Sequence, residues 1–301
     1  MELKDQLSWD EFLKESSKVP FIYDVKPFNR LIAHTKNLFI IAGYGSFTKG
    51  YVLIITKDFL PSFGLVNEQI YEELIFLIKL LKNNIEKKYK RKAVVFEHGM
   101  CACIGGLDRA HIHIMSIDTK SNSESLKSAI ERVLYKRKVG IKYISFGKYK
   151  LENIHDINQF MEDNDENNKD FEIEGKLFKL NDIKNLDTTK WPLVTLNHIK
   201  KGGHYVYFDS GYPLSSFLTT ENFQTQFGRQ VVFENEMNLS RDFKKTMETY
   251  IDKNPMLEPW KWQSLIFEEN IIQTVNETRN TLKNYTSMFR HDYEKFELKI
   301  L

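Results

Sequence analysis

Apolar residues in the first half of the chain recur with two different periods. Apolar runs at residues 38–42 and 51–56 have the length of buried strands and flank a glycine-containing turn. Between residues 66 and 85 the apolar positions recur every three or four residues, which predicts a helix with one buried face. Residues 93–97 and 110–117 predict two more strands. This order predicts an antiparallel sheet with a helix packed across it.

The pattern continues with a predicted helix at residues 123–136 and a strand at 141–146. An acidic, asparagine-rich stretch at 162–170 indicates a solvated loop or linker, because carboxylates in a segment of low hydrophobicity usually face water. The second half predicts a tyrosine-rich strand at 203–209 and an amphipathic helix at 223–232. We therefore expect an α+β fold, in which an antiparallel sheet with packed helices is followed by a second α+β subdomain.

The composition is that of an ordinary folded protein. Of 301 residues, 42% are hydrophobic and 28% are charged, and the chain is long enough for two domains. The 43 basic and 41 acidic side chains give a net charge of +2, too balanced to indicate nucleic-acid binding from long-range electrostatics. Two cysteines separated by one residue suit a reducing compartment. Without a signal-like or membrane-spanning apolar segment, we expect an intracellular, cytoplasmic protein and no membrane association.

Two histidines stand on one face of a predicted strand. His111 and His113 alternate with apolar residues, so both imidazoles project to the same side as Met115. A neutral imidazole can attack phosphorus or bind a metal ion, and a solvated strand face is the purely structural alternative. Cys101 and Cys103 could add sulfur ligands, but their spacing is not that of a zinc site. We therefore expect no metal and no other cofactor.

This segment resembles the signature of the histidine-triad (HIT) superfamily, in which apolar residues separate His-x-His-x-His or His-x-His-x-Gln. Met115 takes the third position here, and Glu97-His98-Gly99 is similar to a second HIT signature on the preceding strand. The resemblance implies a nucleotide hydrolase or nucleotidyltransferase. It makes His113 the nucleophile that attacks an α-phosphorus and forms a covalent nucleotidyl-histidine, with His111 in support. A thioether is a weak acceptor, so Met115 leaves hydrolysis and transfer both open.

Further site candidates surround the histidine pair. Gly105 and Gly106 would allow a backbone to approach phosphate closely, although a simple turn is the alternative. Strand alternation places Arg109 on the histidine face, where it would hold phosphate or form a surface ion pair. His98 is predicted as a leaving-group acid or nucleotide contact, and a core or surface histidine is the alternative.

The second half carries a short motif of its own. Gln226-Phe227-Gly228-Arg229 follows a tyrosine-rich strand and precedes Trp260-Lys261-Trp262, an order that resembles the C-terminal region of CwfJ-like proteins. Gln226 and Arg229 are polar residues in an apolar helix, and Lys261 lies between two tryptophans. We expect one of these three to close a phosphate pocket, with a capping or interdomain hydrogen bond as the structural alternative.

Together these resemblances predict three regions. Residues 1–150 would form a HIT-like nucleotide-binding catalytic domain, residues 151–175 an acidic linker, and residues 176–301 a CwfJ-like subdomain that completes the site. The expected partner is a nucleotide or a nucleotidylated small molecule. The competing hypothesis is a catalytically weak RNA-processing or nucleotide-binding factor, with RNA as a partner and a nuclear location. The sequence leaves the oligomeric state open.

Overall fold

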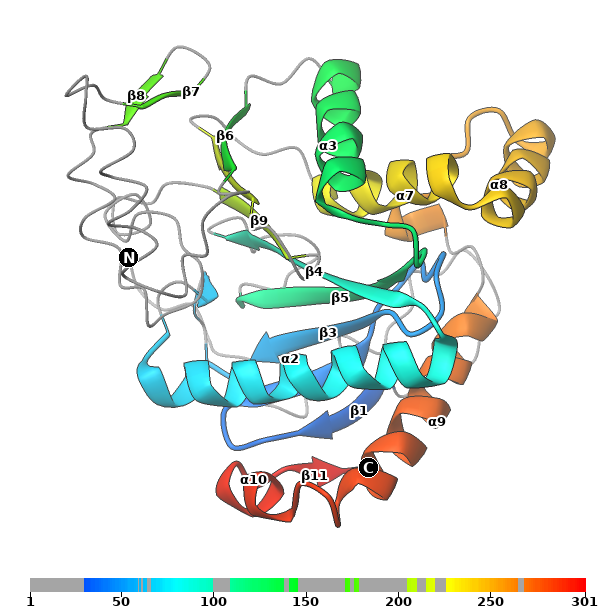
Figure 1. Cartoon of the computed structure of the whole chain (residues 1–301). Coiled ribbons are helices and arrows are strands. Elements are labelled where there is room, and N and C mark those ends of the chain that lie inside the picture. Colours follow the sequence, from blue (N-terminus) through cyan, green and yellow to red (C-terminus); the bar gives the residue numbers. More distant parts are fainter. Residues whose placement is uncertain are drawn as a thin grey trace.

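The computed structural model describes residues 30–58, 60, 62–63, 66–99, 109–137, 141–145, 171–173, 176–178, 205–209, 215–219, 226–264 and 268–301. Within these residues, nine strands form one sheet in which every neighbouring pair is antiparallel (Figure 1). In sheet order the strands are β11 (Lys299–Ile300), β1 (Leu31–His34), β2 (Leu38–Ala42), β3 (Val52–Thr56), β5 (His111–Ile117), β4 (Lys92–Gly99), β9 (Tyr205–Asp209), β10 (Ser215–Thr219) and β6 (Ile141–Ser145). A separate pair is formed by β7 (Phe171–Ile173) and β8 (Lys176–Phe178).

Helices cover both faces of this sheet (Figure 1). One face buries an apolar layer against α2 (Glu68–Tyr89) and α9 (Glu268–Tyr285). The other face buries a second layer against α3 (Ser123–Arg137) and α7 (Phe227–Leu239). Because successive residues of a strand point to opposite faces, β5 contributes Ile112 and Ile114 to the first layer and Met115 to the second. The sheet core is therefore closed on both sides.

The expected antiparallel sheet with packed helices is confirmed. The apolar runs and helical periods of the first half correspond to β2, β3, α2, β4, β5, α3 and β6. The C-terminal half continues the same sheet, because β9 pairs with β4 and β11 pairs with β1. The acidic stretch 162–170 lies outside the described residues.

The predicted helix at 223–232 begins later than expected. Residues 223–225 lie outside the described residues, and α7 begins at Phe227 and continues to Leu239. Gln226 precedes it with a φ of 65°, in the left-handed region, so the backbone turns sharply into the helix. A second helix, α8 (Arg241–Lys253), follows after Ser240, whose hydroxyl accepts a hydrogen bond from the Phe243 N–H at the start of α8.

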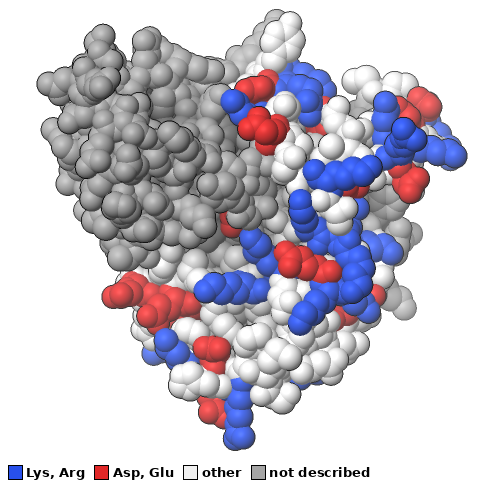
Figure 2. Space-filling model, in the orientation of Figure 1, with Lys and Arg blue, Asp and Glu red and all other residues white. Residues whose placement is uncertain are grey.

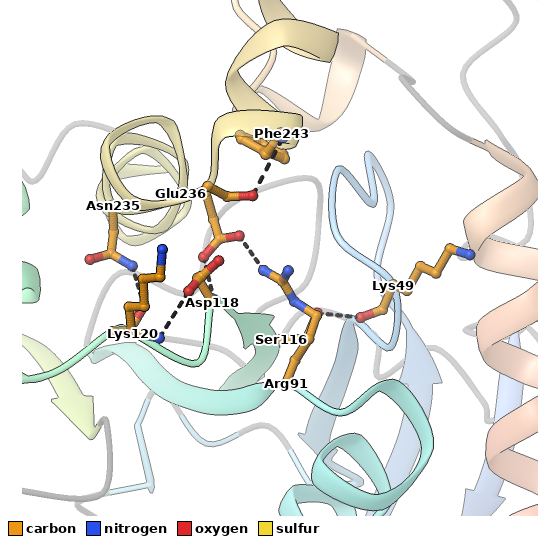
Figure 3. Close-up of polar contacts among 10 residues, drawn as sticks. Lys49, Arg91, Ser116, Asp118, Lys120, Asn235, Glu236 and Phe243 are labelled. Carbon is orange, nitrogen blue, oxygen red and sulfur yellow. Dashed lines mark hydrogen bonds and ion pairs between the residues drawn. The ribbon is translucent and has the colours of Figure 1, made fainter.

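A buried carboxylate fixes the far part of α7 to the sheet (Figure 3). Glu236 accepts hydrogen bonds from the Arg91 guanidinium and, at 2.7 Å, from the Asp118 N–H. One residue earlier, Asn235 Nδ2 donates to the Ser121 hydroxyl at 2.8 Å. These contacts join the C-terminal half to the start of β4 and the end of β5. They determine which residues at the beginning of α7 face the histidines.

The chain continues from α8 through a 3-10 turn (Trp262–Ser264) to α9, and then to α10 (Arg290–Lys295) and β11. Among the described helices, none combines the length and the apolar character that a bilayer crossing needs.

Candidate functional site

The structure places the two imidazoles of β5 on the sheet face that α7 covers. His113 is paired with Leu53 of β3 on one side and with Phe96 of β4 on the other. Its ring stacks on Phe96 with 4.4 Å between centroids and an angle of 6°. The His111 ring lies 5.0 Å from the His113 ring, in an edge-to-face arrangement. The predicted histidine pair is thus held by the pleat of a central strand.

His111 is held in one tautomer by the backbone. Its Nδ1 lies 3.0 Å from the carbonyl oxygen of Arg109, two residues earlier. A carbonyl oxygen can only accept, so the neutral ring carries its proton on Nδ1 and has a lone pair on Nε2. Burial lowers the pKa of His111, and this hydrogen bond offsets part of the shift. At neutral pH the ring is therefore an uncharged base with a defined reactive nitrogen.

His113 is oriented by a side chain that sequence reasoning missed. Its Nδ1 lies 2.7 Å from the hydroxyl oxygen of Tyr51, and the two rings are stacked at 5.9 Å and 11°. Burial lowers the pKa of His113 well below its usual value, and the neighbouring charges of His111, His98 and Arg229 lower it further. Both imidazoles thus have Nδ1 engaged by the protein, and among the described residues neither Nε2 has a hydrogen-bond partner.

Arg229 brings a buried positive charge to the Tyr51 side of this pair. Its guanidinium donates to the carbonyl oxygens of Trp260 (2.7 Å), Tyr44 (2.9 Å) and Gly45 (2.5 Å). Among the described residues, no carboxylate forms an ion pair with it. Burial raises the pKa of Tyr51, whereas the charge and hydrogen bond of Arg229 lower it. The Arg229 guanidinium therefore keeps its positive charge, because the carbonyl oxygens that it binds are neutral.

His98 joins β4 to the first turn of α7. The Gly228 N–H donates to His98 Nε2 at 2.9 Å. A side chain at position 228 would collide with Phe96, because an added Cβ would lie 2.4 Å from its ring. Burial lowers the pKa of His98 to about 3, with smaller contributions from His111 and Arg137. Because His98 Nε2 already accepts a hydrogen bond and its pKa is low, we interpret His98 as a positioning residue and not as the predicted leaving-group acid.

The remaining predicted site residues lie around the pair in different ways. Arg109 is buried, and its Nε donates to the Lys57 carbonyl at 3.1 Å. Gln226 accepts from the Trp262 N–H at 2.6 Å, so it joins α7 to the tryptophan-containing segment. Lys261 is half-exposed and pairs with Glu258. For Gln226 these contacts match the structural alternative of a hydrogen bond between segments.

Other predictions concern residues between β4 and β5 and Met115 within β5. Gly105 and Gly106 lie outside the described residues, as do Cys101 and Cys103. Met115 is fully buried in the apolar layer beneath α3 and α7, opposite Val94 of β4. Its thioether therefore fills core space. Within the described part of the chain, no three His, Cys, Asp or Glu side chains are grouped so that they could hold a metal ion.

Neither a comparison with models of known protein families nor one with curated proteins finds a match for this chain.

Proposed function

We propose that this protein is a HIT-like nucleotide hydrolase or nucleotidyltransferase that acts on the α-phosphate of its substrate. The observation that carries the proposal is the pair of neutral imidazoles on β5, each with Nδ1 engaged and Nε2 left for reaction. An uncharged imidazole nitrogen with a free lone pair is a competent nucleophile for phosphorus. Buried rings with lowered pKa values keep this form below neutral pH.

In the proposed reaction, one Nε2 lone pair forms a bond to the α-phosphorus while the bond to the leaving group breaks. The leaving group departs with the bonding electrons, and the nucleotide stays on the ring as a nucleotidyl-histidine. Water, or the hydroxyl of an acceptor, then attacks the same phosphorus and displaces the ring. Arg229 supports both steps, because a buried cation that pairs with no carboxylate among the described residues favours negative charge on phosphate nearby.

The two rings differ in their fitness for attack. The HIT resemblance assigns attack to His113, which is the more exposed ring of the two. The hydrogen bonds favour His111, because a carbonyl fixes its proton on Nδ1, whereas the Tyr51 hydroxyl can either donate to His113 or accept from it. We therefore assign catalysis to the pair and leave the identity of the attacking ring to a direct measurement.

The test traps the covalent intermediate. Purified protein is incubated with labelled dinucleoside polyphosphates and with nucleoside phosphoramidates, and the acid-labile adduct is mapped to a peptide by mass spectrometry. We expect one of His111→Ala and His113→Ala to abolish the adduct, and both to lower turnover by three orders of magnitude or more, roughly the loss seen when a nucleophile is removed. His291→Ala, on the exposed surface of α10, is the matched control.

Two outcomes would decide against catalysis. If both β5 variants turn over every substrate as the wild type does, the pair is not the reacting centre. If the wild type binds a nucleotide or RNA tightly without turnover or adduct, and His113→Ala weakens that binding, the alternative applies: a nucleotide-binding factor that uses the same face for recognition.

A further inference from the structure

A strongly basic surface lies at the end of α2, away from the histidine pair. Five of the six residues from 87 to 92 are Lys or Arg. Lys87, Lys88, Lys90 and Lys92 are exposed there, where α2 ends and β4 begins. Figure 2 shows Lys and Arg side chains gathered on this part of the surface, with acidic side chains among them. The density of charge contrasts with the balanced composition of the whole chain.

Two lysines from other segments extend this surface. Lys49 is exposed, and its carbonyl accepts a hydrogen bond from the Ser116 hydroxyl near the end of β5. Lys120 is exposed in the turn after β5, next to Ser121, whose carbonyl accepts from Lys92 Nζ at 2.7 Å. Figure 3 shows Lys120 and Lys49 on opposite sides of the Arg91–Glu236 contact, with the Lys49 side chain directed away from it. We call the six exposed residues the lysine cluster: Lys49, Lys87, Lys88, Lys90, Lys92 and Lys120.

Little negative charge offsets the lysine cluster. Lys88 lies 3.6 Å from Glu277, and Glu86 is exposed beside the run. Glu236 is already paired with Arg91, and Arg91 is not a member of the cluster. In the part of the chain that is described, no carboxylate pairs with Lys49, Lys90 or Lys120. Several like charges are therefore held together on a rigid helix end and adjoining strand ends.

The basic residues of α8 provide a comparison within the same molecule. Arg241, Lys244, Lys245 and Lys253 are interspersed with three acidic residues of the same helix, and Lys244 lies 3.7 Å from Glu248. Their charges are nearly balanced locally, as on an ordinary solvated helix. The lysine cluster lacks such alternation.

We propose that the lysine cluster binds the phosphate backbone of a nucleic acid strand. Clustered lysines on one surface are the electrostatic feature that such backbones recognise, and each neutralised phosphate releases counterions. A membrane surface fits less well, because the run 87–92 contains none of the exposed large apolar side chains of the described residues, which are Tyr135, Tyr250, Met256, Ile272, Met288 and Leu301. The same absence of apolar anchors disfavours an acidic protein partner.

This surface is separate from the histidine pair. Asp118 follows His113 by five positions, which corresponds to about 16 Å along a strand, and Ser116, which bonds the Lys49 carbonyl, follows it by three, or about 10 Å. Binding at the lysine cluster therefore needs neither imidazole. The inference is independent of the proposed nucleotidyl chemistry, and the two can fail separately.

The experiment measures the binding of fluorescent 20-nucleotide single-stranded RNA and DNA to the full chain by anisotropy between 50 and 300 mM salt. The test variant combines Lys49→Gln, Lys90→Asn and Lys120→Gln, with Asn chosen because Lys90 has a φ of 53°. The control combines Lys244→Gln, Lys245→Gln and Lys253→Gln on α8. Both variants lose three positive charges, so a general charge effect would be equal in the two.

We expect the cluster variant to bind at least about tenfold more weakly at 100 mM salt, with a salt slope about two units shallower, since each phosphate contact contributes about 0.7. The α8 variant should bind as the wild type does. Unequal binding of the RNA and DNA strands would identify the preferred strand. Equal losses in the two lysine variants, wild-type binding by the cluster variant, or stronger binding to anionic vesicles or polyglutamate than to either strand would each overturn the proposal.

Discussion

Two places along β5 treat positive charge in opposite ways, and α7 takes part in both. At the end of the strand, the Arg91 guanidinium is paired with the buried carboxylate of Glu236. Beside the histidines, Arg229 is bound by three backbone carbonyls and by no carboxylate among the described residues. Arg229 and Glu236 are seven residues apart on α7, which is about two helical turns, so the same side of the helix faces both places.

This difference in partners suggests two roles: Arg91 and Glu236 form a structural ion pair, whereas Arg229 is prepared for a ligand. A carboxylate next to Arg91 neutralises the charge, so that contact has no need of an external anion. Carbonyl oxygens satisfy the hydrogen bonds of Arg229 but leave its charge in place, next to Tyr51 and His113. We infer that the positive charge beside Tyr51 and His113 is retained for an anionic substrate.

The largest effect on folding is expected from Glu236→Ala. Removing the carboxylate leaves the Arg91 charge and the Asp118 N–H without their partner, and breaking such a buried pair costs about 3–5 kcal/mol. Urea unfolding measures the change in the free energy of unfolding. Glu248→Gln, which breaks the exposed pair with Lys244 on α8, is the control and should cost about 0.5 kcal/mol or less. Similar losses in both variants would mean that Glu236 does not fix α7 to the sheet.

A smaller effect, on activity, is expected from Arg229→Gln. Loss of the charge should lower kcat/KM about a hundredfold, or about 2.7 kcal/mol, because the anionic transition state loses a preorganised cation. Arg229→Lys keeps the charge but not the three-carbonyl geometry, so it should retain more activity than Arg229→Gln. Steady-state kinetics on folded protein, verified by circular dichroism, compares them. Equal activity in the two variants would assign the role of Arg229 to geometry alone.

The pH dependence of stability probes the buried imidazoles. Below about pH 6.5 the unfolded chain gains protons that the folded His98 does not accept until about pH 3, so stability falls as pH falls through that window. One such ring contributes on the order of 1.4 kcal/mol per pH unit, or about 2 kcal/mol between pH 6.5 and pH 5. His98→Gln can still accept from the Gly228 N–H but does not titrate. Urea unfolding at pH 7 and pH 5 should show a smaller loss for this variant, and an equal loss would contradict the assignment.

Much of the fold could be predicted from the sequence because the relevant signals are local. Alternation and helical period identified β2, β3, α2, β4, β5 and α3, each of which buries one or two complete faces. The start of α7 was predicted too early, since Phe223 extends the apolar period although the backbone enters the helix from a left-handed Gln226. The pairing of β9 with β4 joins residues more than 100 positions apart, and no local pattern encodes it.

Only the part of the site that lies on a single strand could be predicted from the sequence. The shared face of His111 and His113 follows from strand alternation, and the structure places both rings there. Tyr51 was missed because its role depends on the register between β3 and β5, which pairs Leu53 with His113. Knowing that register would have identified it, since residues 51 and 53 share a face. Gly228 and His98 meet across the two halves, so their contact depended on tertiary packing.

The smallest expected effect concerns the hydroxyl that links Arg229 to His113. Tyr51→Phe keeps the ring stacked on His113 and removes the oxygen 2.7 Å from Nδ1. Without this partner His113 loses the tautomer preference that the Tyr51 hydroxyl imposes, and we expect kcat to drop about tenfold with KM nearly unchanged. Nitrogen-15 NMR of the imidazole reports the tautomers directly, and Tyr135→Phe, on the exposed surface of α3, is the control. If kcat falls while the tautomer signals stay as in the wild type, Tyr51 contacts substrate instead of orienting the ring. If neither changes, the Arg229 charge acts without Tyr51, and the charge contrast between Arg229 and the Arg91–Glu236 pair depends on the guanidinium alone.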